Sequence, residues 1–183
     1  MSDSIQTTDA FFAPLTRFYK QEQIAPLDFH PIGVEKLPEP QKHLLVHDRD
    51  MTTRLECHYN SQIDLKALYI SHEPTSYFRE VLLIAEDSGK PVEYGAIEIN
   101  LKVFPDKLGT EILEGKKPLG GLLVKNDFAF ISSPQTYFEV SSDQHIQDLL
   151  ELDETVKLYG RSNILSTPDG QPIANIVEIL PSH

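Results

Sequence analysis

Residues 76–100 read SYFREVLLIAEDSGKPVEYGAIEIN, and this stretch decides the fold. Its first part is rich in aromatic and branched residues, its polar residues 87–91 have the composition of a turn, and a second apolar run follows, so the stretch predicts a β-hairpin. The two-residue period of a strand places Arg79 on the face that carries Val81 and Leu83. Burying an unpaired guanidinium is costly, so Arg79 requires an anionic partner.

The rest of the chain predicts a second hairpin and several short helices. Turn residues at 167–170 separate two further apolar runs. Long sequential hairpins with few crossover helices are typical of an α+β fold with a single antiparallel β-sheet and flanking helical flaps. The predicted helices are 41–47, 51–59, 108–114 and 142–152, the further predicted strands are 65–71, 128–131, 136–140, 158–165 and 173–180, and 118–123 is predicted to be a turn-bearing segment.

Length and composition narrow the class of protein. The 183 residues fit one domain, 1–183, in which residues 1–42 form a proline-rich N-terminal arm that is too interrupted for long helices. Sixteen basic against 28 acidic residues give a net charge of -12, which disfavours binding to nucleic acid or to an anionic membrane. The single cysteine, Cys57, and the lack of any long apolar run predict a cytoplasmic location without membrane insertion. The sequence predicts no particular oligomeric state.

Glu178 is a second charged residue in the middle of an apolar strand, on the face of Ile176 and Leu180. One interpretation is that Arg79 and Glu178 neutralise each other as a salt bridge in the core. In the other, the planar guanidinium of Arg79 binds a ligand carboxylate and Glu178 lies within proton-transfer reach of the same ligand. The residues alone leave both interpretations open.

Metal and cofactor motifs are weak. His43 and His47 have the spacing of paired helical metal ligands and His58 follows, but the glutamate of the HExxH pattern is missing. Gly120 and Gly121 lack the context of a phosphate-binding loop. The prediction is therefore a protein without a metal and without a cofactor.

Four segments occur in order along the chain: DMTTR (50–54), YFREVLL (77–83), PLG (118–120) and YGRS (159–162) leading to EILP (178–181). Together they resemble chorismate pyruvate-lyase and the wider chorismate-lyase-like superfamily. The resemblance covers roughly residues 43–183 and implies a compact antiparallel sheet whose helical flaps close over a buried aromatic ligand. It implies that Arg79 binds the ring carboxylate and that Glu178 lies at the opposite end of the ligand, the two forming the catalytic pair. The implied substrate-binding residues are Arg79, Met51, Thr52, Leu119, Gly120 and Arg161.

The activity implied by the resemblance is the cofactor-independent elimination of pyruvate from chorismate to give 4-hydroxybenzoate, for quinone or phenolic-lipid precursor supply. The partners are then chorismate and the aromatic product. The chain departs from the family's pattern at Ala96 and Ser162, where the family often has arginines, so two positive charges are missing near a site for a dianion.

Two alternatives to this lyase are open. The first is a non-catalytic small-molecule-binding module related to the effector domain of GntR-type regulators, a domain that belongs to the same superfamily. Those regulators carry a DNA-binding domain before the sensor, whereas residues 1–42 here are proline-rich and not basic, so the lyase is the first expectation. The second alternative is a lyase or isomerase that acts on another carboxylated ring.

Overall fold

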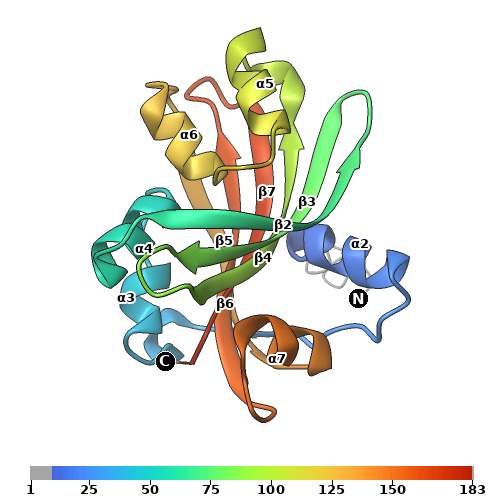
Figure 1. The fold of residues 1–183 in the computed structure, drawn as a ribbon, viewed down its shortest axis with the longest axis vertical. Helices are drawn as coiled ribbons and strands as arrows, with labels where there is room; N and C mark the ends of the chain where they lie inside the picture. Colours follow the sequence, from blue (N-terminus) through green and yellow to red (C-terminus); the bar gives the residue numbers. More distant parts are fainter. Residues whose placement is uncertain (1–9, 183) are drawn as a thin grey trace.

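Seven antiparallel strands form one sheet in the computed structural model, which describes residues 10–182 (Figure 1). The strand order is β1-β5-β6-β7-β4-β3-β2, so the predicted α+β class with a single antiparallel sheet and flanking helices is confirmed. The strands are β1 (His30–Ile32), β2 (Ile63–His72), β3 (Ser76–Ala85), β4 (Lys90–Asn100), β5 (Ile131–Ser141), β6 (Lys157–Ser166) and β7 (Pro172–Leu180).

Short helices cover both faces of the sheet. No helix within residues 10–182 is long and apolar enough to cross a membrane. The helices are α2 (Ala13–Gln21), α3 (Gln41–Leu45), α4 (Met51–Tyr59), α5 (Asp106–Leu113), α6 (Leu119–Lys125) and α7 (Gln144–Leu150), with 3-10 turns η1 (Val34–Lys36) and η2 (Leu101–Val103).

The predicted hairpin of residues 76–100 lies near the middle of the sheet as β3 and β4. In its register, Arg79 lies opposite Ile97 and Val81 lies opposite Gly95. Strand β4 also pairs with β7, where Gly95 lies opposite Glu178. Because successive side chains alternate between faces, the odd-numbered residues of β3 point to one layer of helices and the even-numbered residues to the other, and β4 follows the same alternation after the register shift near Val92.

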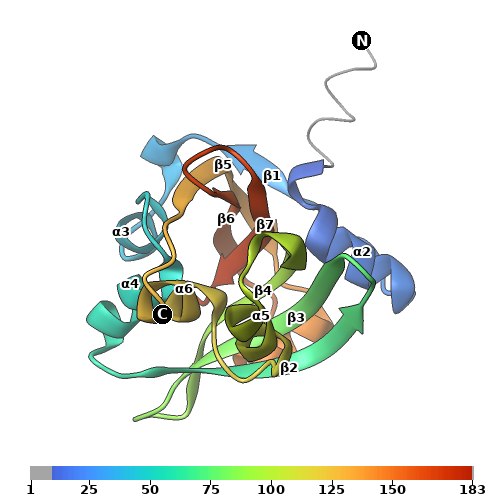
Figure 2. The same cartoon turned by 90° about the horizontal axis from the view of Figure 1, so that it is seen from above.

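The two layers of helices bury separate parts of the core. Helices α2 and α7 pack with Phe78, Tyr94 and Phe138 on one face, and α3, α4, α5 and α6 cover the other. Figure 2 shows α2 on the side of the sheet away from α3, α4 and α6. The side covered by α4 and α6 is the one to which Arg79 points, so these helices position the candidate site.

The N-terminal arm begins with a helix and continues as extended chain. Pro14 lies in the first turn of α2, where a proline costs no helical hydrogen bond. Phe12 is buried and stacks on Phe29 with ring centroids 4.1 Å apart, which holds the extended part of the arm to the start of α2. Residues 1–9 of the predicted arm lie outside the described residues.

The prediction of a turn-bearing segment at 118–123 is wrong, because most of this segment belongs to helix α6. Two glycines lower the helix propensity of this segment by about 1 kcal/mol each. Leu119, Leu122 and Leu123, however, have helical spacing and are all buried. The burial of these leucines outweighs the low helix propensity of the glycines. The glycines alone favour a turn, so the local sequence does not predict this helix.

The two short strands predicted at 128–131 and 136–140 are instead one strand, β5, preceded by loop. The register of β5 with β6 shifts between Pro134 and Thr136, and a proline is tolerated at such a bulge because its missing N–H breaks no regular ladder bond. Phe128 precedes the strand and packs its ring against Phe104, with centroids 5.1 Å apart.

The edges of the sheet are β1 and β2. Strand β1 has three residues with Pro31 at its centre. Strand β2 is longer, but its pairing with β3 is irregular between Ala67 and Tyr69, and it carries exposed Asp64 and Lys66. Both edges are therefore short or interrupted.

A buried polar network lies on the face covered by α2 and α7. The carboxylate of Glu80, 1% exposed, accepts a hydrogen bond from the Tyr94 hydroxyl at 2.7 Å and lies 2.7 Å from Nε2 of His145. The ring of Phe18 stacks on His145 at 5.6 Å between centroids. The hydrogen bond with Glu80 raises the pKa of His145 above its usual range, so the folded state favours the imidazolium.

We expect His145→Gln to reduce the free energy of unfolding by about 1–2 kcal/mol near pH 6 and by much less near pH 9. The folded-state pKa of His145 is raised, so the ion pair stabilises the fold fully below the unfolded-state pKa and ceases to do so as pH rises through the folded-state value. Urea unfolding at the two pH values measures the effect. The exposed pair of His30 and Asp28 provides the control, since His30→Gln is expected to change stability at neither pH. An equal loss for His145→Gln at both pH values contradicts the ion pair.

Candidate functional site

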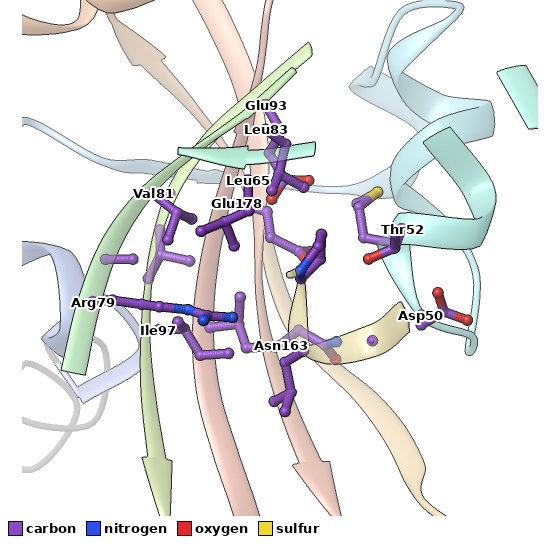
Figure 3. Close-up of a pocket in the computed structure, with 18 of the residues that line it drawn as sticks. Asp50, Thr52, Leu65, Arg79, Val81, Leu83, Glu93, Ile97, Asn163 and Glu178 are labelled. Atoms are coloured by element: carbon purple, nitrogen blue, oxygen red, sulfur yellow. The ribbon is translucent and has the colours of Figure 1, made fainter. Parts of the chain in front are cut away.

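A cavity lies between the sheet face of β3, β4, β6 and β7 and the helices α4 and α6 (Figure 3). Its volume is about 60 Å³, and most of its wall is aliphatic. Of the residues predicted from the sequence as catalytic or substrate-binding, the cavity brings together Arg79, Glu178, Met51, Thr52, Leu119 and Gly120. Arg161 lies outside its lining. The roles assigned to these residues stay predictions.

Arg79 is a buried cation without a carboxylate partner among residues 10–182. Its side chain is 1% exposed, and one terminal nitrogen donates to the carbonyl of Lys117 at 3.1 Å. Its Nε and Nη1 atoms have no hydrogen-bond partner in the described part of the chain. Burial lowers the pKa of Arg79, which expresses the cost of desolvating the guanidinium. Figure 3 shows the guanidinium directed from β3 toward the middle of the lining residues, where an anion would compensate this cost.

Glu178 pairs with Arg161 and not with Arg79, so the interpretation of Arg79 and Glu178 as one core salt bridge is wrong. Nε of Arg161 donates to the Glu178 carboxylate, and Nη1 of Arg161 donates to the carbonyls of Leu45 and His47 at 3.0 and 3.1 Å. These bonds tie β6 to the end of α3 and to the loop before α4. Arg161 therefore neutralises Glu178 and binds β6 to the end of α3 and the loop before α4. Unlike Arg79, it is not among the residues that line the cavity.

The sheet register explains why Glu178 has this partner. Val81, Gly95, Glu178 and Arg161 form one row across β3, β4, β7 and β6. Directly opposite residues on one face have Cβ atoms about 5 Å apart, so Glu178 and Arg161 meet across the β6–β7 pair. On the other side, Gly95 has no side chain, and a Cβ there would collide with the Val177 carbonyl. Gly95 therefore contributes only backbone atoms to the lining of the cavity.

Sequence reasoning missed Glu93, a second carboxyl group in the lining. It lies on β4 two residues before Gly95, is 4% exposed, and its Oε2 atom has no hydrogen-bond partner within the described residues. Burial and the carboxylate of Glu178 raise the pKa of Glu93 well above its usual range, against an opposing effect of Arg161. The period-2 argument that found Arg79 would have found Glu93 too, since it shares a face with Ile97.

Asn163 is another lining residue that sequence reasoning missed. Its amide nitrogen donates to the hydroxyl of Ser132 at 2.9 Å, so β5 fixes the orientation of the amide on β6. Asn163 lies in the row of Arg79, through Ile97 and Ile176. The Arg79 end of the cavity therefore has one cation and one neutral amide, and the Glu178 end has two carboxyl groups.

Helices α4 and α6 close the cavity. Asp50 caps α4 by accepting a hydrogen bond from the Thr53 amide at 2.8 Å. A Cβ on Gly120 of α6 would lie 2.7 Å from Cβ of Asp50, so the two helix starts are in close contact. An engineered cavity of about 150 Å³ binds benzene, so a cavity of 60 Å³ must widen to take a ring, and separating α4 from α6 provides the space.

We expect Gly120→Ala to lower the free energy of unfolding by about 1–3 kcal/mol, because the new methyl group forces α4 and α6 apart. Gly121→Ala is the matched control in the same helix. Its Cβ would lie 3.6 Å from Cγ2 of Thr52, an ordinary contact, so only the gain in helix propensity of up to about 1 kcal/mol applies. Urea unfolding of both variants measures the difference. Equal effects of the two substitutions would show that the contact between the helices is not tight.

Comparisons with known proteins identify the fold but no sequence relative. No family model matches the chain, and no curated protein matches it in sequence. The chain is similar to the structure of the effector domain of PhnF from Mycobacterium smegmatis, with a TM-score of 0.54 and 10% identity over 84% of this chain and 92% of that chain. It is also similar to YydK of Bacillus subtilis, described as a possible transcriptional regulator, with a TM-score of 0.53 and 12% identity over 94% and 93% of the two chains.

A third similar structure is the ligand-binding domain of a protein from Bordetella bronchiseptica assigned to the GntR family of transcriptional regulators. The TM-score is 0.50 and the identity 17%, over 64% of this chain and 85% of that chain. Similarity at this level of identity concerns the fold alone. The chain therefore has the chorismate-lyase-like fold, in the form found in GntR-family ligand-binding domains.

Proposed function

We propose that this protein is a small-molecule-binding module whose cavity takes a ligand with one carboxylate and an apolar body. The observation that carries the proposal is Arg79, a desolvated cation whose two unpaired N–H groups face a cavity and find no carboxylate among the described residues. A ligand carboxylate would accept a charge-assisted hydrogen bond from this guanidinium. Aliphatic side chains such as Val81, Leu165 and Ile176 would contact the body of the ligand.

The charges around the cavity favour a monoanion. Arg161 and Glu178 cancel each other, and burial and the neighbouring Glu178 raise the pKa of Glu93, which favours its neutral form. Arg79 is then the cation of the lining that has no carboxylate partner among the described residues, while the remaining lining carboxylate, Asp50, accepts a hydrogen bond from the Thr53 amide as the cap of α4. Chorismate has two carboxylates. One could pair with Arg79, but the other would be buried without a cationic partner, which is energetically costly. This charge count supports a binding module over the lyase, as does the similarity to a GntR-family ligand-binding domain.

The test is titration calorimetry with benzoate and with benzamide, which has the same shape and no charge. We expect benzoate to bind and benzamide to bind at least about tenfold more weakly, because only benzoate forms charge-assisted hydrogen bonds with Arg79. Equal affinity for the two compounds, or no binding of either, contradicts the proposal.

A second candidate is chorismate pyruvate-lyase, supported by one observation. Six of the residues that the family resemblance assigns to the site line a single cavity, with Arg79 and Glu178 on strands two inter-strand spacings apart, roughly 10 Å. The test is to incubate the purified protein with chorismate and to follow 4-hydroxybenzoate and pyruvate together, with and without a chelator. Equal amounts of both products, unaffected by the chelator, would establish the lyase and with it a supply of quinone or phenolic-lipid precursors. No turnover rejects it.

A further inference from the structure

The end of the cavity opposite Arg79 holds three ionisable groups in one buried cluster. Glu178 contacts Arg161 directly, and Glu93 lies beside Glu178 across the space left by Gly95. Arg161 can balance one of the two carboxylates, so ionising both would leave a net negative charge away from solvent. The cluster therefore favours binding one proton, and the carboxyl group without a direct cationic partner is that of Glu93.

We propose that Glu93 is a specificity-determining residue that donates a hydrogen bond to a neutral oxygen group of the ligand, a hydroxyl or a carbonyl, at the end remote from the carboxylate bound by Arg79. This inference rests on the proposed function. It assigns the ligand class as monocarboxylates with a neutral oxygen substituent at the opposite end. Such a substituent accepts from Glu93, and a hydroxyl can in addition donate to the ionised Glu178.

The surroundings of Glu93 support this protonation state. From β7, Glu178 disfavours a second negative charge, while Arg161 on β6 is engaged by Glu178 and by two backbone carbonyls. From α4, Tyr59 faces the carboxyl, and its own pKa is raised by burial and by Glu93. From β3, the residue opposite Glu93 is the apolar Leu83. Burial is the largest contribution to the raised pKa of Glu93, and Glu178 is the second.

The same cluster discriminates against an ammonium group. An ammonium group only donates hydrogen bonds, so it cannot accept the proton of Glu93, and it would also lie near the guanidinium of Arg161. The cavity should therefore prefer 4-hydroxybenzoate to benzoate, and benzoate to 4-(aminomethyl)benzoate, which is zwitterionic.

The first measurement is the ratio of dissociation constants for benzoate and 4-hydroxybenzoate, by titration calorimetry near pH 6. We expect wild type to prefer 4-hydroxybenzoate by about tenfold, the effect of one hydrogen bond to a buried group. In Glu93→Met the preference is expected to fall to about twofold or less. Glu139→Gln is the control, because Glu139 lies outside the cavity lining and pairs with Lys157, so this variant should keep the wild-type ratio.

The second measurement is the pH dependence of the same ratio between about pH 5 and pH 8, below ionisation of the ligand's phenol. As pH rises through the raised pKa of Glu93, the carboxyl loses its proton and its donor, so the wild-type preference for 4-hydroxybenzoate should fall. Glu93→Gln has an amide donor that does not titrate, so its profile should be flat. Thermal unfolding of each variant confirms that the measurements are made on folded protein.

The outcomes separate this inference from the proposed function. If benzoate binds more tightly than benzamide but Glu93→Met leaves the preference for 4-hydroxybenzoate intact, the role of Glu93 is wrong and the carboxylate-binding function stands. Tighter binding of 4-(aminomethyl)benzoate than of 4-hydroxybenzoate also overturns the role of Glu93, since an ammonium group cannot accept a hydrogen bond from it. If none of these carboxylates binds, both proposals fail.

Discussion

Replacing Arg79 with methionine should abolish carboxylate binding and raise the stability of the ligand-free protein. Arg79 is a desolvated cation that makes one hydrogen bond to a backbone carbonyl, so its burial is poorly compensated without ligand. Methionine fills a similar volume without this cost. We expect the free energy of unfolding to rise by about 1–2 kcal/mol, after allowing for the lost bond to Lys117, and benzoate affinity to fall by about 100-fold.

Arg79→Lys refines this test. Lysine keeps the positive charge but loses the two-pronged geometry, so benzoate binding should weaken by about 1–3 kcal/mol, less than in the methionine variant. Arg17→Met is the matched control, because Arg17 also lies over an aromatic ring but pairs with Glu73 at the surface. It should leave benzoate affinity unchanged. A large loss of ligand-free stability in Arg79→Met with unchanged affinity would make Arg79 a structural residue.

Arg161→Met should have the opposite effect on stability, a loss of about 3–5 kcal/mol near pH 7. The substitution leaves Glu178 as an uncompensated buried carboxylate beside Glu93 and removes the donor for the carbonyls of Leu45 and His47. Denaturant unfolding measures the loss. Lys157→Met, which removes an exposed ion pair on the same strand, should leave the stability nearly unchanged.

The pH dependence of the Arg161→Met variant provides a second criterion. Without Arg161, the negative charge buried in this cluster has no counter-ion, and proton uptake in acid removes that charge, so the penalty is larger at neutral pH than in acid. The stability gap from wild type should therefore narrow toward about pH 5. A gap that is small at pH 7, or that widens in acid, contradicts the assignment of Arg161 as the counter-ion.

The two-residue period of the strands was sufficient to predict Arg79 and Glu178 as inward charges and to predict the two hairpins that form the sheet. It could not predict the partner of Glu178. That pairing depends on the register of β6 against β7, and Arg161 also contacts backbone groups near α3, more than 100 positions away in the sequence. The sequence of one strand is thus enough to predict which charged residues point into the core. Predicting which residues they pair with requires the register of several strands.

Helix α6 and Glu93 were missed for different physical reasons. In α6 the glycines favour a turn locally, and burial of three leucines against other elements outweighs that preference. Glu93 follows a proline near the start of a strand, where a charged residue is ordinarily solvent-exposed, and only the covering helices and the neighbouring strands bury it. The error at α6 therefore concerns tertiary context, whereas the two-residue period does place Glu93 on the face of Ile97.

The irregular edges of the sheet also govern how this protein behaves at high concentration. An open edge strand offers unpaired N–H and C=O groups to strands of other molecules, which is a route to fibrils. Pro31 removes a donor from β1, and the bulge near Ala67 bends β2 while Asp64 and Lys66 place charges along it. Each edge thus resists the addition of a further strand, so the sheet is protected against growth into larger aggregates from either side.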